Sequence, residues 1–357
     1  MFKILIGEIS SNKAIVIAKF IKKHYQNIQI FSYDNLSYTR KIHTKYVDEH
    51  IVLKKKDTTS YIKRISEVIA DLKIDLFLPI HSDYIGEIIK RKYLFGNTLW
   101  YLGEYKDYEK LHIKKELQKI AERLEINVPK EYTNIHTAKI PFVGKPTDKS
   151  SSKGVIYFNN ENKINQYREH DFSNYIFQDY ISGIGCGYSV YSHQGKIEVG
   201  FAHKRLLEFP YSGGSSIYRE SFKEGEMRKV AEKILSTINW TGFAMFEFKY
   251  TKEGQFILIE VNPRIWGSIN QGLMNGVNYF KTLIPEDLNK GTMTKSEIRT
   301  YMSPQIYFSL LQSVFKLEIK NIILFLKNFS SNKSDVSFWN DYKGYISIIL
   351  RLLHRIK

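Results

Sequence analysis

The stretch FEFKYTKEGQFILIEVNPR, residues 246–264, decides the fold of this chain. Two runs rich in aromatic and β-branched residues flank a glycine-containing turn, a pattern that predicts a β-hairpin. If the turn is centred at residues 253–254, Glu247 lies directly opposite Glu260. Asn262 follows two residues later, so it shares a face of the strand with Glu260. The pattern therefore gathers two carboxylates and a carboxamide on one face of a hairpin.

Two facing carboxylates need compensation, because like charges directly opposite each other destabilise a strand pair. A cluster of oxygen ligands suits Mg²⁺, which commonly binds one or two carboxylates together with substrate phosphates. The alternative is an exposed hairpin whose two acids are solvated. The positions of nearby basic residues and small-residue loops bear on this choice.

Composition limits the classes of protein to consider. The chain has 357 residues, 43% of them hydrophobic, which suffices for two or three domains with a large core. Cys186 is the only cysteine, so no disulfide can form within the chain, and a cytoplasmic protein is expected. Met1–Gly7 reads as a short strand and not as a signal peptide, and no run of 18 apolar residues predicts a transmembrane helix.

The formal net charge of +16 predicts acidic partners, such as nucleotides, anionic sugars or an anionic membrane surface. The lysines are scattered, and the sequence contains no zinc-ligand spacing, basic arm or helix-turn-helix pattern. Nucleic acid is therefore not an expected partner.

The first hundred residues alternate between strand and helix patterns, which predicts a parallel sheet with crossover helices. The expected elements are, in order, Phe2–Ile6, Lys13–Tyr25, Ile28–Tyr33, Ser60–Leu72 and Ile74–Pro79. No G-x-G-x-x-G follows the first strand, so the dinucleotide-binding fingerprint is absent. His81 and Asp83 follow the last of these strands, where they either cap the next helix or touch a ligand.

Basic residues and a small polar loop come next. A basic amphipathic helix is predicted over Asp107–Leu124 and carries Lys110, Lys114 and Lys115, one of which could reach a phosphate. A short strand at 140–146 carries Lys145. The following loop, TDKSSSKGV at 147–155, has small residues that let backbone N–H groups approach an anion. Together these features predict a phosphate site, although each alone also fits a solvated helix face or an ordinary turn.

Further polar residues suit a nucleotide and an acceptor. The strand pattern at Tyr175–Ile181 offers backbone groups that can mimic a base pair to adenine. His203 and Arg205 share one face of the next strand by alternation. Arg264, directly after the hairpin, can hold a phosphate or carboxylate in a bidentate fork.

Beyond about residue 285 the composition shifts to apolar helical patterns with interspersed lysines and arginines. Ile306–Phe329 and Tyr345–Ile356 show this pattern, and Asn332–Asp335 is expected to be the loop between them. These helices either pack as a C-terminal extension or lie on an anionic membrane surface.

In their order along the chain, these motifs resemble the ATP-grasp superfamily of carboxylate–amine ligases. The similarity covers about residues 1–285 and rests mainly on Phe201–Ser215 and on Glu260–Ser268, which reads EVNPRIWGS. Carbamoyl-phosphate-synthase-like and biotin-carboxylase-like proteins of bacterial biosynthetic clusters are the members that it resembles most.

The resemblance implies an α/β and α+β protein with three parts. Residues 1–105 would form a Rossmann-like pre-ATP-grasp domain. Residues 106–285 would form the ATP-grasp domain, with subdomains at about 106–180 and 181–285, and residues 286–357 a C-terminal helical extension.

The resemblance also implies roles for single residues. Those implied to bind ATP are Lys110, Lys145, Ser151, Ser152, Gly154, Gln178, Asp179, Tyr180 and Ile181. Those implied to bind two Mg²⁺ ions, for which Mn²⁺ can substitute, are Glu247, Glu260 and Asn262. Those implied to act on the transferring phosphoryl group and the acceptor are Arg264, Arg205 and His203. Many relatives have an acidic residue for the ribose hydroxyls where this chain has Cys186, so the ribose contact departs from the family pattern.

The activity implied is an ATP-dependent, ADP-forming ligation of a carboxylate to an amine through an acylphosphate. The expected substrates are small molecules, such as an amino acid or an acidic sugar in polysaccharide or natural-product biosynthesis. An ATP-grasp kinase and a non-catalytic nucleotide-binding scaffold at the membrane surface are the alternatives. The protein is expected to be cytoplasmic or peripheral to the inner face of the membrane, with a homodimer as one expected assembly.

Overall fold

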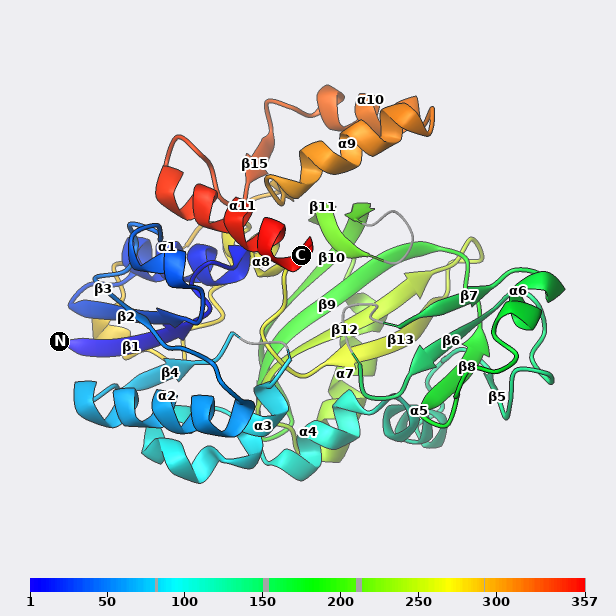
Figure 1. The fold of residues 1–357 in the computed structure, drawn as a ribbon, viewed down its shortest axis with the longest axis horizontal. Coiled ribbons are helices and arrows are strands. Elements are labelled where there is room, and N and C mark those ends of the chain that lie inside the picture. The colour runs from blue at the N-terminus through cyan, green and yellow to red at the C-terminus, as the bar shows by residue number, and fades with distance from the viewer. Residues whose placement is uncertain (81–82, 150–153, 210–213, 292, 357) are drawn as a thin grey trace.

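The computed structural model describes residues 1–80, 83–149, 154–209, 214–291 and 293–356. These residues form three β-sheets with helices packed around them (Figure 1). Within the described ranges no helix has both the length and the apolar character needed to cross a membrane. The mixed α/β and α+β class predicted from the sequence is therefore confirmed.

The N-terminal domain is a four-stranded parallel sheet in the order β3-β2-β1-β4, with α1 and α2 on opposite faces (Figure 1). Its elements are β1 (Phe2–Gly7), α1 (Asn12–His24), β2 (Ile28–Asp34), a 3₁₀ turn (Ser37–Arg40), β3 (Glu49–Val52), α2 (Thr58–Leu72) and β4 (Leu76–Leu78). Ser11 and Asp57 cap the two helices by accepting hydrogen bonds from backbone N–H groups of the first turn. The predicted alternation is confirmed, and β3 is an additional edge strand.

The segment that follows contains two helices where one was predicted. Its elements are α3 (Ile85–Lys90), a 3₁₀ stretch (Lys92–Leu99), α4 (Tyr105–His112) and α5 (Lys114–Arg123). The single helix expected over Asp107–Leu124 is wrong, because Ile113 adopts an extended conformation between α4 and α5. The break turns the chain so that the backbone N–H of Lys114 donates to the carbonyl of Thr147, 3.0 Å away.

A small antiparallel sheet in the order β5-β8-β6-β7 lies at the far end from the N-terminus (Figure 1). Its elements are β5 (Glu131–Tyr132), β6 (Phe142–Pro146), β7 (Ile156–Phe158), α6 (Glu161–Gln166) and β8 (Tyr175–Asp179). Aromatic side chains form its core, with the rings of Phe142 and Phe158 stacked 4.6 Å apart. This sheet carries Lys145 on β6 and Gln178 on β8.

The largest sheet has seven strands in the order β13-β12-β9-β10-β11-β14-β15. Its strands are β9 (Ile184–His193), β10 (Lys196–Phe209), β11 (Ser215–Ser221), β12 (Gly242–Tyr250), β13 (Phe256–Asn262), β14 (Arg299–Tyr301) and β15 (Asn332–Ser334). The connecting helical elements are α7 (Gly225–Ile238), α8 (Ile269–Met274) and a 3₁₀ turn (Glu286–Leu288). β12 and β13 are the predicted hairpin, and they form one edge of this sheet.

The predicted register of the hairpin is confirmed, since Glu247 pairs with Glu260. The turn is not centred at residues 253–254, however, because Tyr250 pairs with Phe256 next to it. A β-bulge opposite the step from Glu247 to Phe248 shifts the register by one residue and so produces the predicted pairing. Ile259 is the residue without a cross-strand partner at this bulge. The bulge thus brings the two acids opposite each other.

The C-terminal part contains α9 (Gln305–Phe315), α10 (Ile319–Lys327) and α11 (Tyr342–Ile356). The continuous helical pattern expected over 306–329 is interrupted, because Leu317 has a φ of 56°, in the left-handed region. The loop expected at Asn332–Asp335 is also wrong, because β15 pairs there in parallel with β14. The C-terminal part is therefore joined to the large sheet.

A buried ion pair attaches the C-terminal part to the large sheet. Arg219 on β11 forms an ion pair with Asp335, and neither side chain is exposed to solvent. Asn270 Nδ2 donates to Asp335 Oδ1 at 2.9 Å, and Arg219 Nε donates to Thr300 Oγ1 at 2.9 Å. At the other end of the segment, Arg351 of α11 donates to Glu8 Oε2 at 2.7 Å. The C-terminal part therefore links the large sheet to the N-terminal domain.

Asp335→Ala should destabilise the protein strongly, because it leaves the Arg219 charge buried without its partner. Removing one member of a buried pair typically costs about 3–5 kcal/mol. The midpoint of urea unfolding measures this loss. Arg64→Ala is the matched control, since it breaks the exposed pair with Glu67 and should shift the midpoint little. Equal midpoints for the two variants would contradict a structural role for the buried pair.

Candidate functional site

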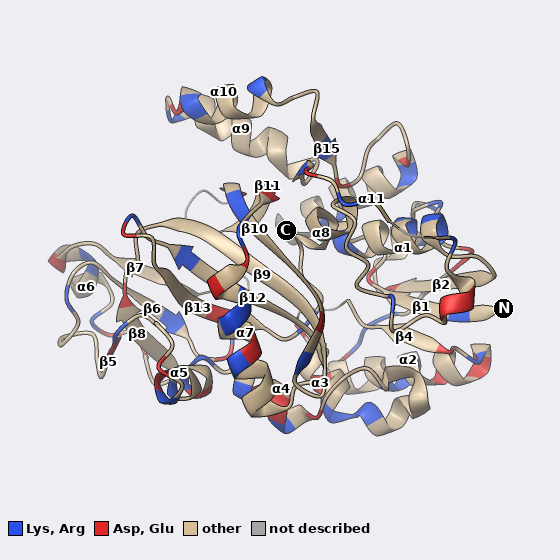
Figure 2. Cartoon of the chain, turned by 180° about the vertical axis from the view of Figure 1, so that it is seen from behind, with Lys and Arg blue, Asp and Glu red and all other residues tan. Residues whose placement is uncertain are grey.

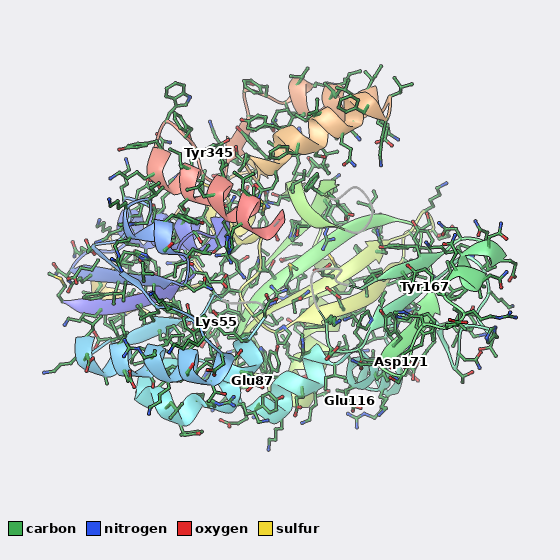
Figure 3. The ribbon with its side chains drawn as sticks, viewed as in Figure 1. Lys55, Glu87, Glu116, Tyr167, Asp171 and Tyr345 are labelled. Atoms are coloured by element: carbon green, nitrogen blue, oxygen red, sulfur yellow. The ribbon has the colours of Figure 1, made fainter. Side chains whose placement is uncertain are left out.

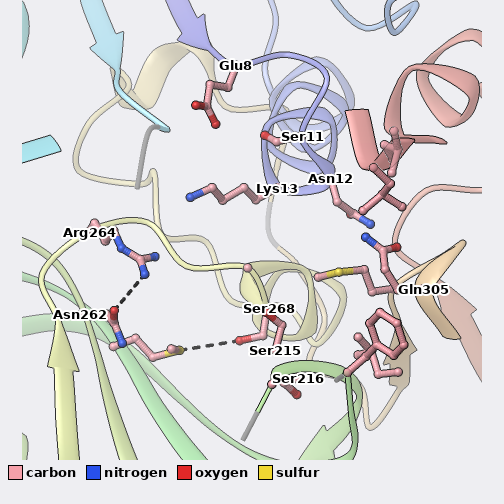
Figure 4. A pocket seen from close by; sticks show the side chains of 18 of the residues that line it. Glu8, Ser11, Asn12, Lys13, Ser215, Ser216, Asn262, Arg264, Ser268 and Gln305 are labelled. Carbon is pink, nitrogen blue, oxygen red and sulfur yellow. Dashed lines mark hydrogen bonds between the residues drawn. The ribbon is translucent and has the colours of Figure 1, made fainter. Parts of the chain in front are cut away.

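The hairpin brings two acids into contact with one amide. Asn262 Nδ2 donates to Glu247 Oε1 at 3.1 Å and to Glu260 Oε1 at 2.9 Å. Asn262 is buried, and its carboxamide points into a cavity together with Arg264 (Figure 4). The three residues predicted from the hairpin pattern are thus neighbours, and the amide lies between the two carboxylates.

Cationic side chains surround these acids, as the facing charges require. Arg205 of β10 forms ion pairs with Glu247 and, at 3.2 Å, with Glu208. Arg264 NH2 donates to Asn262 Oδ1 at 2.9 Å. The exposed-hairpin alternative is therefore excluded, because both acids are only partly accessible and lie among arginines.

The surroundings shift the pKa values of Glu247 and Glu260 in opposite directions. Burial raises the pKa of Glu247, and the charge of Glu260 raises it further against the opposing charge of Arg205. Burial also acts to raise the pKa of Glu260, but Lys114, Asn262, Lys145 and Arg264 outweigh it, so this pKa lies below the usual value. The carboxylate of Glu247 therefore has the higher proton affinity of the two, and that of Glu260 the lower.

The donor set fits a Mg²⁺ ion. Asn262 Nδ2 occupies the point between the carboxylates, where a cation would replace its N–H groups, and a turn of the amide would present Oδ1 instead. No cluster of three or more acidic, histidine or cysteine ligands occurs in the part of the chain that the structure describes. An ion here would therefore complete its coordination with water or substrate phosphates, as Mg²⁺ commonly does.

Lys145 on β6 faces this group from the small sheet. Its Nζ donates to Gln178 Oε1 at 3.0 Å, and Gln178 Nε2 donates in turn to Gln118 Oε1 at 3.0 Å. Burial lowers the pKa of Lys145 to about 8, although the charge of Glu260 opposes this shift. The side chain of Gln178 therefore orients Lys145, while Asp179 Oδ1 accepts a hydrogen bond from Tyr132 at 2.5 Å.

The lysine nearest the acids from the preceding helices is Lys114, not Lys110. Lys110 is 44% exposed at its side chain and forms an ion pair with Asp107 at 2.8 Å. Lys114 is 8% exposed, donates to the carbonyl of Lys149 at 2.5 Å, and is the leading charge that lowers the pKa of Glu260. The helix break at Ile113 separates Lys114 from Lys110, and the periodicity of the sequence does not reveal this break.

Three further residues predicted to bind ATP, Gly154, Tyr180 and Ile181, lie at the small sheet. Gly154 has a φ of +75°, and a Cβ there would lie 2.9 Å from Pro146. Tyr180 is exposed, and Ile181 follows it at the end of β8. Ser151 and Ser152 lie outside the described residues. Cys186 is fully buried, and burial raises the pKa of its thiol to about 11.

A cavity of about 670 Å³ adjoins the acids (Figure 4). Arg205, Arg264 and all three hairpin residues line it, as does Asp83, whereas His81 lies outside the described residues. His203 does not line it, because its ring is buried behind Ser268, whose Oγ lies 3.3 Å from Nε2. Burial lowers the pKa of His203 to about 3, so the ring is neutral and positions Ser268 at the cavity wall.

The other half of the cavity comes from segments that the sequence did not connect with the site. The loop after β1 and the first turn of α1 contribute Glu8 and residues 10–13, and α11 contributes Ile348, Arg351 and Leu352. The carboxyl end of β1 is where open parallel sheets bind ligands, so the first loop could have been identified by position. No comparable signal marks α11.

Several buried polar atoms in this half lack a partner among the described residues. They are both carboxamide atoms of Asn12, Ser216 Oγ and Gln305 Oε1. The carboxamides of Asn12 and Gln305 point toward one another in Figure 4. Because an unsatisfied buried polar group is costly, these atoms favour a polar ligand that donates and accepts hydrogen bonds.

The comparisons with known proteins agree with this geometry. The ATP-grasp domain family matches residues 108–268. A D-alanine–D-alanine ligase of Fusobacterium nucleatum is 27% identical over 161 residues, which cover 42% of this chain. The chain spans 55% of the length of that relative.

Solved structures share the fold over most of the chain. An L-amino acid ligase from Bacillus licheniformis superposes with a TM-score of 0.61 at 15% identity, covering 79% of this chain and 72% of that one. The biotin carboxylase domain of a Hydrogenobacter thermophilus 2-oxoglutarate carboxylase, determined with MgADP, has a TM-score of 0.60 at 14% identity and covers 78% and 68%. The chain therefore shares the fold of these structures, and its residues 108–268 match the ATP-grasp domain family.

Proposed function

We propose that this protein is an ATP-dependent, ADP-forming ligase that joins a carboxylate to an amine through an acylphosphate. The observation that carries the proposal is the pair Glu247 and Glu260 on the hairpin, which faces Lys145 and opens onto a cavity of about 670 Å³. The names of two similar proteins, a D-alanine–D-alanine ligase and an L-amino acid ligase, support the reaction class.

In this proposal ATP lies between the small sheet and the hairpin. Lys145 and Lys114 neutralise the phosphates, and backbone groups at the end of β8, including Ile181, hold adenine. Glu247, Glu260 and Asn262 would hold Mg²⁺, as two ions in this proposal, or Mn²⁺ in its place. Bound there, the metal would supply the charge neutralisation that phosphoryl transfer requires.

The chain's own residues then guide two displacements. A carboxylate oxygen of the substrate attacks the γ-phosphorus, the bond to ADP breaks, and an acylphosphate forms. The amine nitrogen next attacks the acyl carbon, phosphate leaves with the bonding electron pair, and the nitrogen loses a proton. Arg264 and Arg205 line the cavity where charge accumulates on the phosphoryl oxygens, and their fixed positions stabilise it without rearrangement.

The acceptor is proposed to occupy the half of the cavity between α1 and α11. Arg351 there is paired with Glu8, whereas both carboxamide atoms of Asn12 and Oε1 of Gln305 lack a partner among the described residues. These groups suit a hydroxyl- or amide-bearing substrate, in line with an amino acid or an acidic sugar. A homodimer and a cytoplasmic location stay predictions from the sequence.

Glu247→Gln and Lys145→Ala should each lower substrate-dependent ADP release by about a hundredfold or more, because each removes charge that stabilises the transferring phosphate. A coupled assay of ADP release over carboxylate and amine pairs measures this effect. Glu116→Gln, at an exposed site on α5, is the control and should leave the rate unchanged.

The same assay separates a ligase from a kinase. With hydroxylamine as the amine, an acylphosphate yields a hydroxamate, whereas a kinase that phosphorylates a hydroxyl releases a stable phosphate ester. ADP release without hydroxamate or amide would refute the ligase. Undiminished ADP release by both variants would refute the proposed site.

Asn262→Asp and Asn262→Leu should differ in their need for Mg²⁺. The aspartate offers carboxylate oxygens beside Glu247 and Glu260 that can ligate a metal ion, whereas the leucine offers no ligand atom. We expect the leucine variant to raise the half-saturating Mg²⁺ concentration by about tenfold or more, and the aspartate variant to retain metal-dependent activity. Titration of ADP release with Mg²⁺ measures both, and an unchanged requirement in the leucine variant would remove Asn262 from the metal site.

A further inference from the structure

The hairpin of α9 and α10 is packed with its polar side chains inside. Ser309, Ser313 and Asn321 are buried where the two helices meet. Asn321 Nδ2 donates to Ser313 Oγ at 3.3 Å, and Ser313 Oγ donates to the carbonyl of Ser309 at 3.0 Å. Small polar residues at a helix–helix contact are typical of helices in lipid, where neighbouring side chains and not water satisfy polar groups.

The apolar side chains of the same hairpin face outward. The exposed large hydrophobic residues are Tyr307, Phe308, Leu311, Val314, Phe315, Leu317, Ile319, Ile323, Leu326 and Phe329. Phe315 is 79% exposed and Leu317 is 83% exposed. The hairpin projects from the body of the protein, and its side chains stand clear of the rest of the chain (Figures 1 and 3). Such a concentration of exposed apolar surface marks a site of interaction.

Only part of the α9–α10 hairpin packs against the rest of the protein. Ile306 and Phe325 are buried against Leu207, Ile217 and Tyr218 of the large sheet. These contacts fix the hairpin to β10 and β11 while leaving its outer residues uncovered. Because the inner residues of the hairpin already pack on the large sheet, its exposed apolar side chains do not belong to a core contact within this chain.

The charges of the hairpin indicate what covers it. Residues 305–329 contain three lysines, Lys316, Lys320 and Lys327, and one acid, Glu318. Basic residues are visible at the ends of α9 and α10 in Figure 2. An anionic lipid surface attracts lysines and accepts apolar side chains at the same place, whereas a second copy of the hairpin would bring like charges together.

Aromatic residues next to α11 extend this surface. Trp339 is 91% exposed, and Phe338 and Tyr342 are also exposed. The segment that leads into α11 lies on the same side of the molecule as the hairpin, at the top of Figure 1. Tryptophan and tyrosine favour the boundary between lipid headgroups and acyl chains, because their rings are amphipathic.

We propose that the outer face of the α9–α10 hairpin docks on an anionic lipid bilayer, lying in the plane of its interface. The apolar residues enter the boundary of the acyl chains, and the lysines contact acidic headgroups. Neither helix has the length to span the bilayer. This docking is independent of the ligase reaction, since no hairpin residue beyond Gln305 lines the cavity.

Co-sedimentation of the full-length protein with vesicles tests the proposal. We expect binding to phosphatidylcholine vesicles that contain phosphatidylserine, with weaker binding to phosphatidylcholine alone and at high salt. Phe315→Glu combined with Leu326→Glu should weaken binding to the anionic vesicles by about tenfold or more, because both side chains are exposed and would become charged. The double variant should fold normally, as its circular dichroism and ADP release would show.

Tyr93→Glu is the matched control, because Tyr93 is 78% exposed but lies in the N-terminal half of the chain. This variant should bind vesicles like the unchanged protein. Failure of the unchanged protein to bind anionic vesicles would overturn the proposal. So would self-association that the double variant abolishes while vesicle binding is unaffected, because the hairpin would then be an interface between two copies.

Discussion

Two carboxylates held opposite each other on a buried strand pair are the constraint on which this structure depends. Glu247 and Glu260 repel each other, and burial strengthens that repulsion because the surroundings screen it poorly. The compensating charges come from separate parts of the chain: Arg205 on β10, Lys145 on β6 and Lys114 on α5. These cations lie on both sheets and on α5, so their attraction to the two acids draws the small sheet and the large sheet together.

The hairpin and the N-terminal alternation could be predicted from the sequence because their signals are local. A period of two with a glycine turn identifies β12 and β13, and cap residues such as Ser11 and Asp57 mark helix starts. The identity of the nearer lysine could not be predicted, because it depends on a helix break at Ile113 that tertiary hydrogen bonds to Thr147 stabilise. The same holds for β15, whose strand conformation comes from pairing with β14 and not from its own composition.

Side-chain roles were harder to predict than side-chain positions. His203 and Arg205 share a face of β10, as alternation requires, yet Arg205 enters the cavity while His203 stays buried behind Ser268. Gln178 lies beside Lys145 and orients it, a contact between two strands that no single-strand pattern contains. The contribution of α11 comes from a segment more than 300 residues away from the loop after β1, and only the folded chain brings Arg351 to Glu8.

The bulge at Ile259 has a consequence for how this hairpin can change in evolution. Because strand side chains alternate, losing Val261 from β13 would turn Asn262 away from the face that it shares with Glu260. A loss within the turn leaves the bulge and the acids where they are. Insertions and deletions should therefore accumulate at residues 251–255 among descendants of this gene, while the length from Ile259 to Asn262 stays constant.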